Sequence, residues 1–169
     1  LLHYSSIDLR KYKSIFEKAN VLREYLLDIY ENYQLDQSDA DFRFGESNYP
    51  IDNIYIEQPF TFFNSGGSSA KTMATLQRFN GMVSWIVYEL FSMAPEYVLA
   101  TQARKHCGLK IPRGQKAKEV VLKHLLETEP AFKIEYTSYG NPKPESYDRA
   151  DAIIVARAGD IIEKQVDTE

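Results

Sequence analysis

The chain has 169 residues and a formal net charge of −4, and its length fits one domain. Its 44% apolar and 26% charged residues are typical of a globular protein, so wholesale disorder is excluded. The single cysteine excludes an internal disulfide and a cysteine-rich zinc site. No apolar run reaches the roughly 18–20 residues of a membrane span. The acidic balance alone argues against nucleic-acid binding, but a net charge hides its distribution.

The N-terminal part of the chain predicts a strand, a helix, a loop and a second strand. Residues 1–7 are short and mixed with an apolar start, which favours a strand. Apolar residues recur every three or four positions over 11–33, which predicts an amphipathic helix. The polar stretch 35–53 predicts a long loop. The β-branched and aromatic residues 54–56 predict a short strand that ends at Glu57.

The remainder alternates between helices and strands. Residues 70–91 predict a helix that is apolar around much of its circumference, which favours burial against a sheet and against a further surface such as a partner subunit. The pattern then predicts strands over 97–101 and 131–137, a helix over 115–127, a loop over 138–145 and a last helix that begins near Ser146 or Tyr147. The alternation predicts an α/β fold with a mixed sheet.

Three carboxylates form the most informative pattern. Glu57 ends its strand, and Asp148 and Asp151 lie three residues apart, on one face of the last predicted helix. Clustered carboxylates repel one another unless cations neutralise them, and hard oxygen ligands favour Mg²⁺ or Mn²⁺. Each acid alone has an ordinary structural explanation, as a helix cap or a solvated charge.

Three motifs occur in an order that adds to this pattern. A strand ends in Glu-Gln at 57–58 and is followed by an aromatic residue and a helix, a Gly-containing turn leads to a lysine over 114–118, and Asp-x-x-Asp-Ala stands at 148–152. In this order the sequence resembles the RuvC-like Holliday junction resolvases of the RNase H-like superfamily, over residues 55–158. Phage-type members are included in that resemblance.

The resemblance implies a single RNase H-like nuclease domain over 1–169, α/β in class, with a mixed central sheet flanked by helices. It implies a structure-selective endodeoxyribonuclease that resolves four-way DNA junctions in recombination and repair. Glu57, Asp148 and Asp151 would be the metal ligands for two Mg²⁺ ions, for which Mn²⁺ can substitute, and Lys118 would lie near the scissile phosphate. A homodimer is implied, because paired cuts across a junction need two active sites.

The sequence departs from the family at its start. The first strand of the family carries a Gly-x-Asp, and here Asp8 is followed almost at once by the predicted helix. We therefore expect residues 1–7 to be the third strand of the fold and the opening strands, with the missing aspartate, to precede Leu1. Asp8 is the alternative for that aspartate. If no such strand precedes Leu1, a metal ligand is missing and catalysis is in doubt.

The basic residues are concentrated near the proposed site. The stretch 104–124 has seven Lys or Arg residues against one Glu and is net +6, which leaves −10 for the rest of the chain. Dense positive charge suits contacts with DNA phosphates, although a solvated helix face is the simpler explanation. We expect DNA contacts from the following residues: Lys105, Lys110, Arg113, Lys116 and, by stacking on junction bases, Phe60, which could equally be a core residue.

Two other functions stay open. One is an RNase H-like nuclease for other branched or flap DNA, and the other is a non-catalytic junction-binding protein. Low cysteine content fits a reducing compartment, such as the cytoplasm of a bacterial or phage-infected cell or the mitochondrial matrix. No membrane partner is expected.

Overall fold

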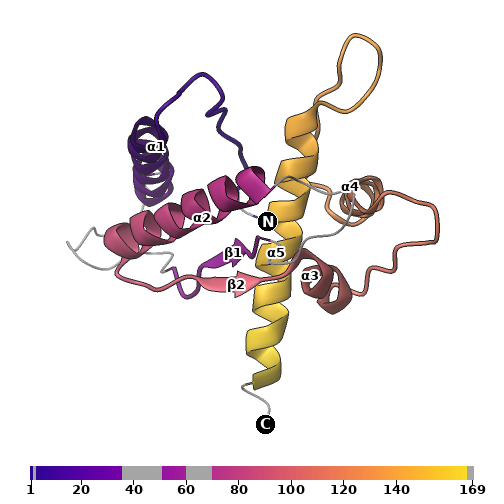
Figure 1. Ribbon diagram of the computed structural model, residues 1–169. Helices are drawn as coiled ribbons and strands as arrows, with labels where there is room; N and C mark the ends of the chain where they lie inside the picture. Colours follow the sequence, from indigo (N-terminus) through magenta and orange to yellow (C-terminus); the bar gives the residue numbers. More distant parts are fainter. Residues whose placement is uncertain (2, 36–50, 60–69, 167–169) are drawn as a thin grey trace. The chain divides into compact units, whose positions relative to one another are not determined.

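The computed structural model describes residues 1, 3–35, 51–59 and 70–166. The protein is a mixed α/β chain, mostly helical, with one small parallel sheet (Figure 1). Its elements in chain order are α1 (Ile15–Leu35), β1 (Tyr55–Glu57), α2 (Ala70–Phe91), β2 (Glu96–Val98), α3 (Ala100–His106), α4 (Ala117–Thr128) and α5 (Pro144–Val166).

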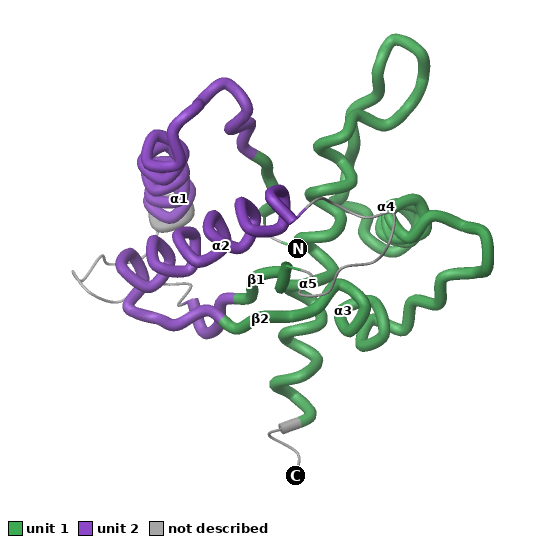
Figure 2. The backbone as a smooth tube through the Cα atoms, in the orientation of Figure 1, with its two compact units in different colours: residues 1–6, 55–60, 96–169 green, residues 7–54, 61–95 purple. Residues whose placement is uncertain are grey.

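The chain divides into two compact units, coloured separately in Figure 2. The first unit consists of residues 1–6, 55–60 and 96–169, and the second of residues 7–54 and 61–95. The sheet and helices α3 to α5 belong to the first unit, and α1 and α2 form the second. The single nuclease domain expected from the sequence stays a prediction.

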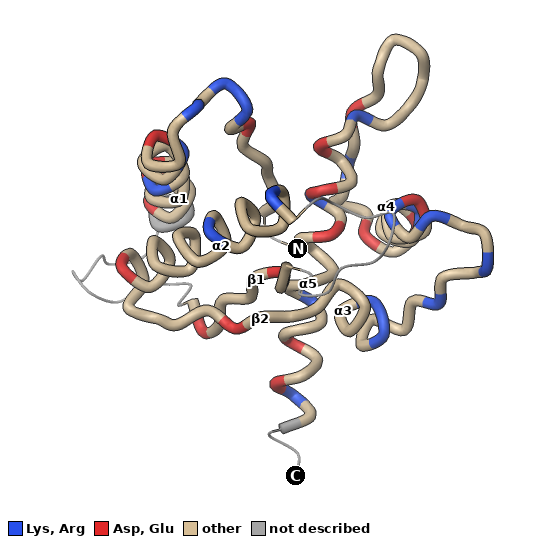
Figure 3. Tube along the Cα trace, viewed as in Figure 1, with Lys and Arg blue, Asp and Glu red and all other residues tan. Residues whose placement is uncertain are grey.

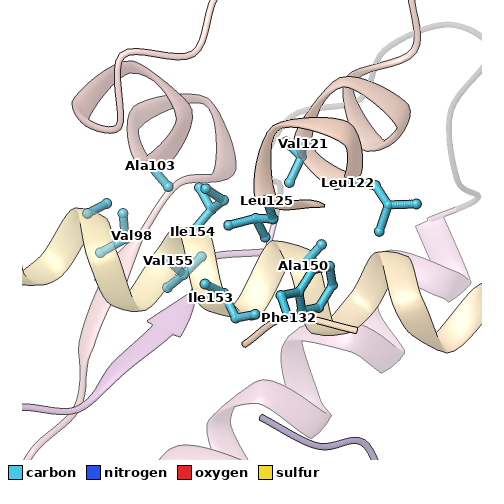
Figure 4. Packing of buried hydrophobic residues seen from close by; sticks show 11 residues of the cluster. Val98, Ala103, Val121, Leu122, Leu125, Phe132, Ala150, Ile153, Ile154 and Val155 are labelled. Carbon is cyan, nitrogen blue, oxygen red and sulfur yellow. The ribbon is translucent and has the colours of Figure 1, made fainter. Parts of the chain in front are cut away.

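Helix α5 is the central helix of the first unit, against which α3, α4 and β1 pack. Its buried residues recur at steps of three and four, so they form one apolar face. This face packs against α3 and α4, and the buried cluster is drawn in Figure 4. Small residues on both sides, Ala103 and Ala150, are fully buried and let the helix backbones approach closely. The cluster comprises Val98, Ala103, Val121, Leu122, Leu125, Phe132, Ala150, Ile153, Ile154, Val155 and Ala158.

The sheet pairs β1 with β2 in parallel, with Tyr55 opposite Glu96 and Glu57 opposite Val98. The next amide extends the ladder, since Gln58 N donates to Val98 O at 3.0 Å. A side-chain contact fixes β1 on α5: the ring of Tyr55 fills the space over Gly159. The Tyr55 hydroxyl donates to Glu163 Oε1 at 3.2 Å, and burial together with this carboxylate raises the pKa of Tyr55 to about 12.

Helices α1 and α2 pack together in the second unit. The Tyr30 and Phe91 rings meet edge to face with centroids 5.4 Å apart, and Arg23 Nε lies 3.5 Å from Glu89 Oε2. Helix α2 has the bounds that the sequence predicts. Its described apolar residues are only partly covered, however: Ile86 and Val87 are buried, whereas Trp85 is 65% exposed, and Leu76 and Tyr88 are also exposed.

Two predicted strands are wrong. Residues 1–7 form no strand wherever the structure describes them. Side chains hold this segment instead: the Tyr4 ring packs on Phe132 with centroids 5.1 Å apart, and Arg149 Nε donates to Ser6 Oγ at 3.0 Å. Residues 131–137 form only one isolated bridge, Tyr136 with Pro142, because the chain turns back on itself there. A strand needs a partner ladder, which local alternation does not supply.

Several helix or strand boundaries differ from the prediction. Helix α1 begins at Ile15, four residues later than expected, and strand β1 begins at Tyr55, one residue later than expected. The strand expected over 97–101 ends at Val98, because a short helix, α3, begins at Ala100. Helix α4 begins two residues later than expected, at Ala117. Helix α5 begins earlier than expected, at Pro144, where a proline at the first helical position loses no hydrogen bond. None of the described helices is long and apolar enough to cross a membrane.

Candidate functional site

Four segments of the first unit bring charged side chains to one place. Glu57 is the last residue of β1, and Asp151 lies in the third turn of α5. Both line a small hollow together with Arg104 of α3. The other residues of the hollow are apolar, namely Ala100, Ala103, Ile154 and Val155. The hollow therefore holds two carboxylates and a guanidinium against a largely apolar wall.

The packing of α5 decides how exposed each acid is. Ala150, Ile153 and Ile154 face the core, so Asp151, between them in sequence, stands at the edge of the packed face with its side chain 19% exposed. Asp148, three residues earlier, lies on the same side of the helix one turn nearer to its start and is 69% exposed. The two acids thus lead from the apolar hollow outwards to solvent.

Lys118, in the first turn of α4, lies between these two acids. Its Nζ is 3.3 Å from Asp148 Oδ1, to which it donates a hydrogen bond, and 3.7 Å from Asp151 Oδ2. Partial burial alone would lower the pKa of Lys118, but the hydrogen bond and the charges of Asp148, Asp151 and Glu57 outweigh it and raise the pKa. Lys118 is therefore held in its charged form beside the carboxylates.

The surroundings of the two carboxylates in the hollow disfavour their ionised forms. Partial burial, followed by the negative charge of Asp151, raises the pKa of Glu57. Burial likewise raises the pKa of Asp151, and Asp148 adds to that effect. The charges of Lys118 and Arg104 oppose both shifts without cancelling them. Additional positive charge at this place would stabilise the ionised carboxylates further.

The donor chemistry of this site fits a divalent cation, because Glu57, Asp148 and Asp151 offer hard carboxylate oxygens whose mutual repulsion a cation relieves. Their spacing fits less well: within the described part of the chain, no three His, Cys, Asp or Glu side chains are grouped closely enough to hold a metal ion. The ammonium group of Lys118 supplies the neutralising charge in this arrangement.

The basic residues predicted to contact DNA lie on α3 and on the connection to α4, where Figure 3 shows Lys and Arg in succession. Lys105, Lys110 and Arg113 are exposed, and none of them forms an ion pair with any residue that the structure describes. Lys116 is also exposed and pairs with Glu119 at 3.3 Å. Exposed cations that form no ion pair with a described residue suit phosphate contacts.

The sequence predicted most of this set but not all of it. Glu57, Asp148, Asp151 and Lys118 come together, whereas Phe60 lies outside the described residues. Asp8, the alternative first-strand acid, binds Arg10 through two side-chain hydrogen bonds, which lower the pKa of Asp8 to about 2.

Arg104 is the residue that sequence reasoning missed as part of the hollow, since it was counted only within the basic stretch. The available signal was the spacing of Ala100, Ala103 and Cys107, three small residues at helical intervals. That spacing predicts a short helix whose small face packs closely on a neighbour, which directs Arg104, beside Ala103, to the edge of that contact.

Comparisons with protein-family models, with curated proteins and with solved structures find no match to this chain.

Proposed function

We propose that this protein is a structure-selective endodeoxyribonuclease that cleaves four-way DNA junctions, with a site of RNase H-like type formed by Glu57, Asp148, Asp151 and Lys118. The observation that carries the proposal is the convergence of these side chains from three separate segments of the chain. A strand-end carboxylate and a helical carboxylate share one hollow, and a lysine bridges the helical pair.

Phosphodiester cleavage needs an activated water and relief of the negative charge that develops on the phosphate. To hold Mg²⁺, Glu57, Asp148 and Asp151 would have to come closer together than they stand in this structure; a bound Mg²⁺ would supply Lewis acidity and lower the pKa of a bound water. Lys118 lies 3.7 Å from Asp151 and Arg104 lines the hollow together with Asp151, and both cations would neutralise charge on a bound phosphate. The raised pKa of Glu57 and of Asp151 means that a cation, which favours the ionised carboxylates, would bind in competition with protons.

The exposed cations Lys105, Lys110, Arg113 and Lys116 would bind the phosphates of the DNA arms. The carboxylates that the chemistry requires repel the phosphates of DNA. Basic residues on the same protein would offset this repulsion. DNA affinity through these residues would fall steeply as salt is added. A plot of the logarithm of the binding constant against the logarithm of the salt concentration would have a slope of about −1 for each phosphate contact.

A homodimer is part of the proposal, and helix α2 is the surface we assign to it. Trp85 and Tyr88 of α2 are exposed, and their rings lie with centroids 6.0 Å apart. Exposed aromatic residues of this kind are typical of the centres of protein interfaces. Replacing Trp85 and Tyr88 with Ser should give a folded monomer by light scattering, and an unchanged dimer would contradict the assignment.

The proposal is tested with synthetic DNA substrates. The purified protein is incubated with a labelled four-way junction, a flap and a linear duplex of the same sequence, each with Mg²⁺ or with a chelator. We expect Mg²⁺-dependent nicks in the junction near its branch point and none in the duplex. Equal cutting of the flap would favour a nuclease for branched DNA in general, and absence of cutting from every substrate would refute the nuclease.

One observation favours a non-catalytic junction-binding protein as the second candidate. Lys118 already neutralises Asp148 and Asp151, and no three described acids are close enough to hold a metal. That candidate predicts junction binding that is independent of Mg²⁺ and no cleavage. The same set of substrates, assayed for binding by gel shift, distinguishes the two functions.

A further inference from the structure

Residues 135–143 form a hairpin, here called the Tyr139 hairpin, that precedes α5 directly. Figures 1 and 2 show it standing beyond the first turn of that helix. Lys143 N donates to Glu135 O at 2.9 Å and Thr137 N donates to Asn141 O at 2.8 Å, which ties the two arms together. An ion pair between the Lys143 and Glu135 side chains closes the base of the hairpin.

The tip of the hairpin is a tight, internally bonded turn. Gly140 adopts φ +77°, a conformation that favours glycine, and its N–H donates to Thr137 O at 3.0 Å. The Asn141 N–H donates to the Thr137 hydroxyl oxygen at 3.2 Å. The backbone of the turn is therefore held in place without any help from the side chain of Tyr139.

Tyr139 is presented at this tip with 90% of its surface exposed. Three other tyrosines of the first unit are used in packing: Tyr4 lies against Phe132, Tyr55 lies over Gly159, and Tyr147 packs on the core cluster. Tyr136, in the same hairpin, is 56% exposed, which leaves Tyr139 as the most exposed ring of the hairpin. The Tyr139 ring thus contributes almost nothing to the fold, although the loop that carries it is fixed. A flat aromatic face on a rigid support is suited to stacking on a base at low entropic cost.

The uncharged tip and the position of the hairpin favour nucleic acid as its partner. The single lysine of the hairpin, Lys143, pairs with Glu135 at its base, and residues 136–142 carry no charge, so the tip does not repel phosphates. Asp148 lies four residues into α5, about 6 Å along the helix axis, and Tyr139 lies five residues before the start of α5, which is at most about 17 Å of extended chain. Tyr139 therefore lies within about 23 Å of Asp148, a distance that one strand spans in about seven nucleotides.

We propose that Tyr139 is a base-stacking residue that binds an unpaired or splayed base of branched DNA within about seven nucleotides of the carboxylate site. This inference rests on the proposed function, since it takes branched DNA as the ligand. It adds a contact outside the carboxylates and the basic stretch, made by an aromatic side chain whose removal leaves the core intact.

The test measures binding and base environment in a protein that does not cut. Asp151→Asn is the background, and Tyr139→Ala, Tyr139→Phe and Ser138→Ala are compared in it. The probe is a four-way junction with 2-aminopurine placed singly at positions one to eight from the branch point. We expect Tyr139→Ala to weaken junction binding about 10-fold and to abolish the 2-aminopurine fluorescence change at one position. Tyr139→Phe and the neighbouring Ser138→Ala should retain both.

Three results separate the inference from its premise. Unchanged affinity and fluorescence in Tyr139→Ala, with normal junction binding by the Asp151→Asn parent, would refute the stacking and leave the nuclease proposal intact. Failure of the parent to bind any junction would refute both. A change in the sedimentation coefficient of Tyr139→Ala without a change in DNA affinity would show that the tip contacts protein, and it would also refute the stacking.

Discussion

The contact between Gly159 and Tyr55 sets the position of Glu57, and Gly159→Ala tests it. A Cβ at residue 159 would lie well under 3.0 Å from three carbons of the Tyr55 ring, whereas ordinary contact begins at 3.4 Å. The ring must therefore retreat by about 1 Å, and the hydrogen bond of Tyr55 to Glu163 opposes that movement. Since Tyr55 and Glu57 belong to the same three-residue strand, displacement of the ring moves the catalytic carboxylate of our proposal.

The expected magnitude combines two opposing effects. Overpacking costs about 1–3 kcal/mol, and the gain in helix propensity from Gly to Ala returns about 1 kcal/mol. Because three ring carbons are affected, we take the upper part of the range and expect the free energy of unfolding to fall by about 2 kcal/mol. A displacement of about 1 Å at a catalytic group costs on the order of 100-fold in rate, so junction cutting should fall by a comparable factor.

The assay is urea unfolding together with single-turnover cutting of a labelled junction. Gly81→Ala in α2 is the matched control, because a Cβ there meets nothing within 4 Å and should stabilise the protein by about 1 kcal/mol. Adding Tyr55→Val to Gly159→Ala should recover part of the lost stability, because the valine removes the ring with which the new Cβ clashes. Stabilisation of Gly159→Ala equal to that of Gly81→Ala would refute the packing argument.

Three further predictions follow from the charges of the first unit. Asp151→Asn should raise the free energy of unfolding at pH 7 and leave it unchanged at pH 3 in urea titrations. In the wild type, the folded-state pKa of Asp151 lies above the ordinary 3.8, so protonated Asp151 stabilises the fold at low pH and this contribution is lost as the pH rises through the raised pKa. Asparagine has no charge to lose, so the variant avoids that loss at pH 7. Arg157→Ala should cost about 3 kcal/mol, because it leaves the carboxylate of Glu129, with its side chain 11% exposed, buried without its partner, and Glu129→Gln should recover most of that loss in thermal melts. Lys118→Gln should slow cutting and move the acidic limb of its pH–rate profile to higher pH, because Lys118 lowers the pKa of Glu57 and of Asp151; an unmoved limb would show that neither carboxylate controls the rate.

Helical periodicity carried the sequence-based prediction furthest. It gave α2 its observed bounds and located α1, α4 and α5 to within a few residues, because an amphipathic helix is specified by neighbours three and four positions apart. Strands depend on partners elsewhere in the chain. Residues 1–7 have a sequence compatible with a strand, yet they are held by side-chain contacts of Tyr4 and Ser6 instead of a backbone ladder.

The sequence motifs predicted some residues of the candidate site, whereas a residue that reaches the site through helix packing was missed. Spacing along α5 places Asp148 and Asp151 on one side. Lys118 was assigned only through the family resemblance, as a residue near the scissile phosphate, and its contacts of 3.3 Å with Asp148 and 3.7 Å with Asp151 were not predicted. Arg104 could not be distinguished from the other basic residues by charge alone. It reaches the hollow because the small residues of α3 allow that helix to pack closely on α5.

The most direct test of the central claim compares two aspartates of α5 in one cleavage experiment. Asp151 lines the hollow, whereas Asp160 is exposed on the same helix and pairs with Lys164 at 2.7 Å. We measure Mg²⁺-dependent cutting of a labelled four-way junction, and its binding in the same samples, for the wild type, Asp151→Asn and Asp160→Asn. The account predicts that Asp151→Asn binds the junction but cuts it at least about 100-fold more slowly, a loss of about 2.7 kcal/mol in barrier lowering, while Asp160→Asn cuts like the wild type. Equal cutting by the two variants would contradict the account.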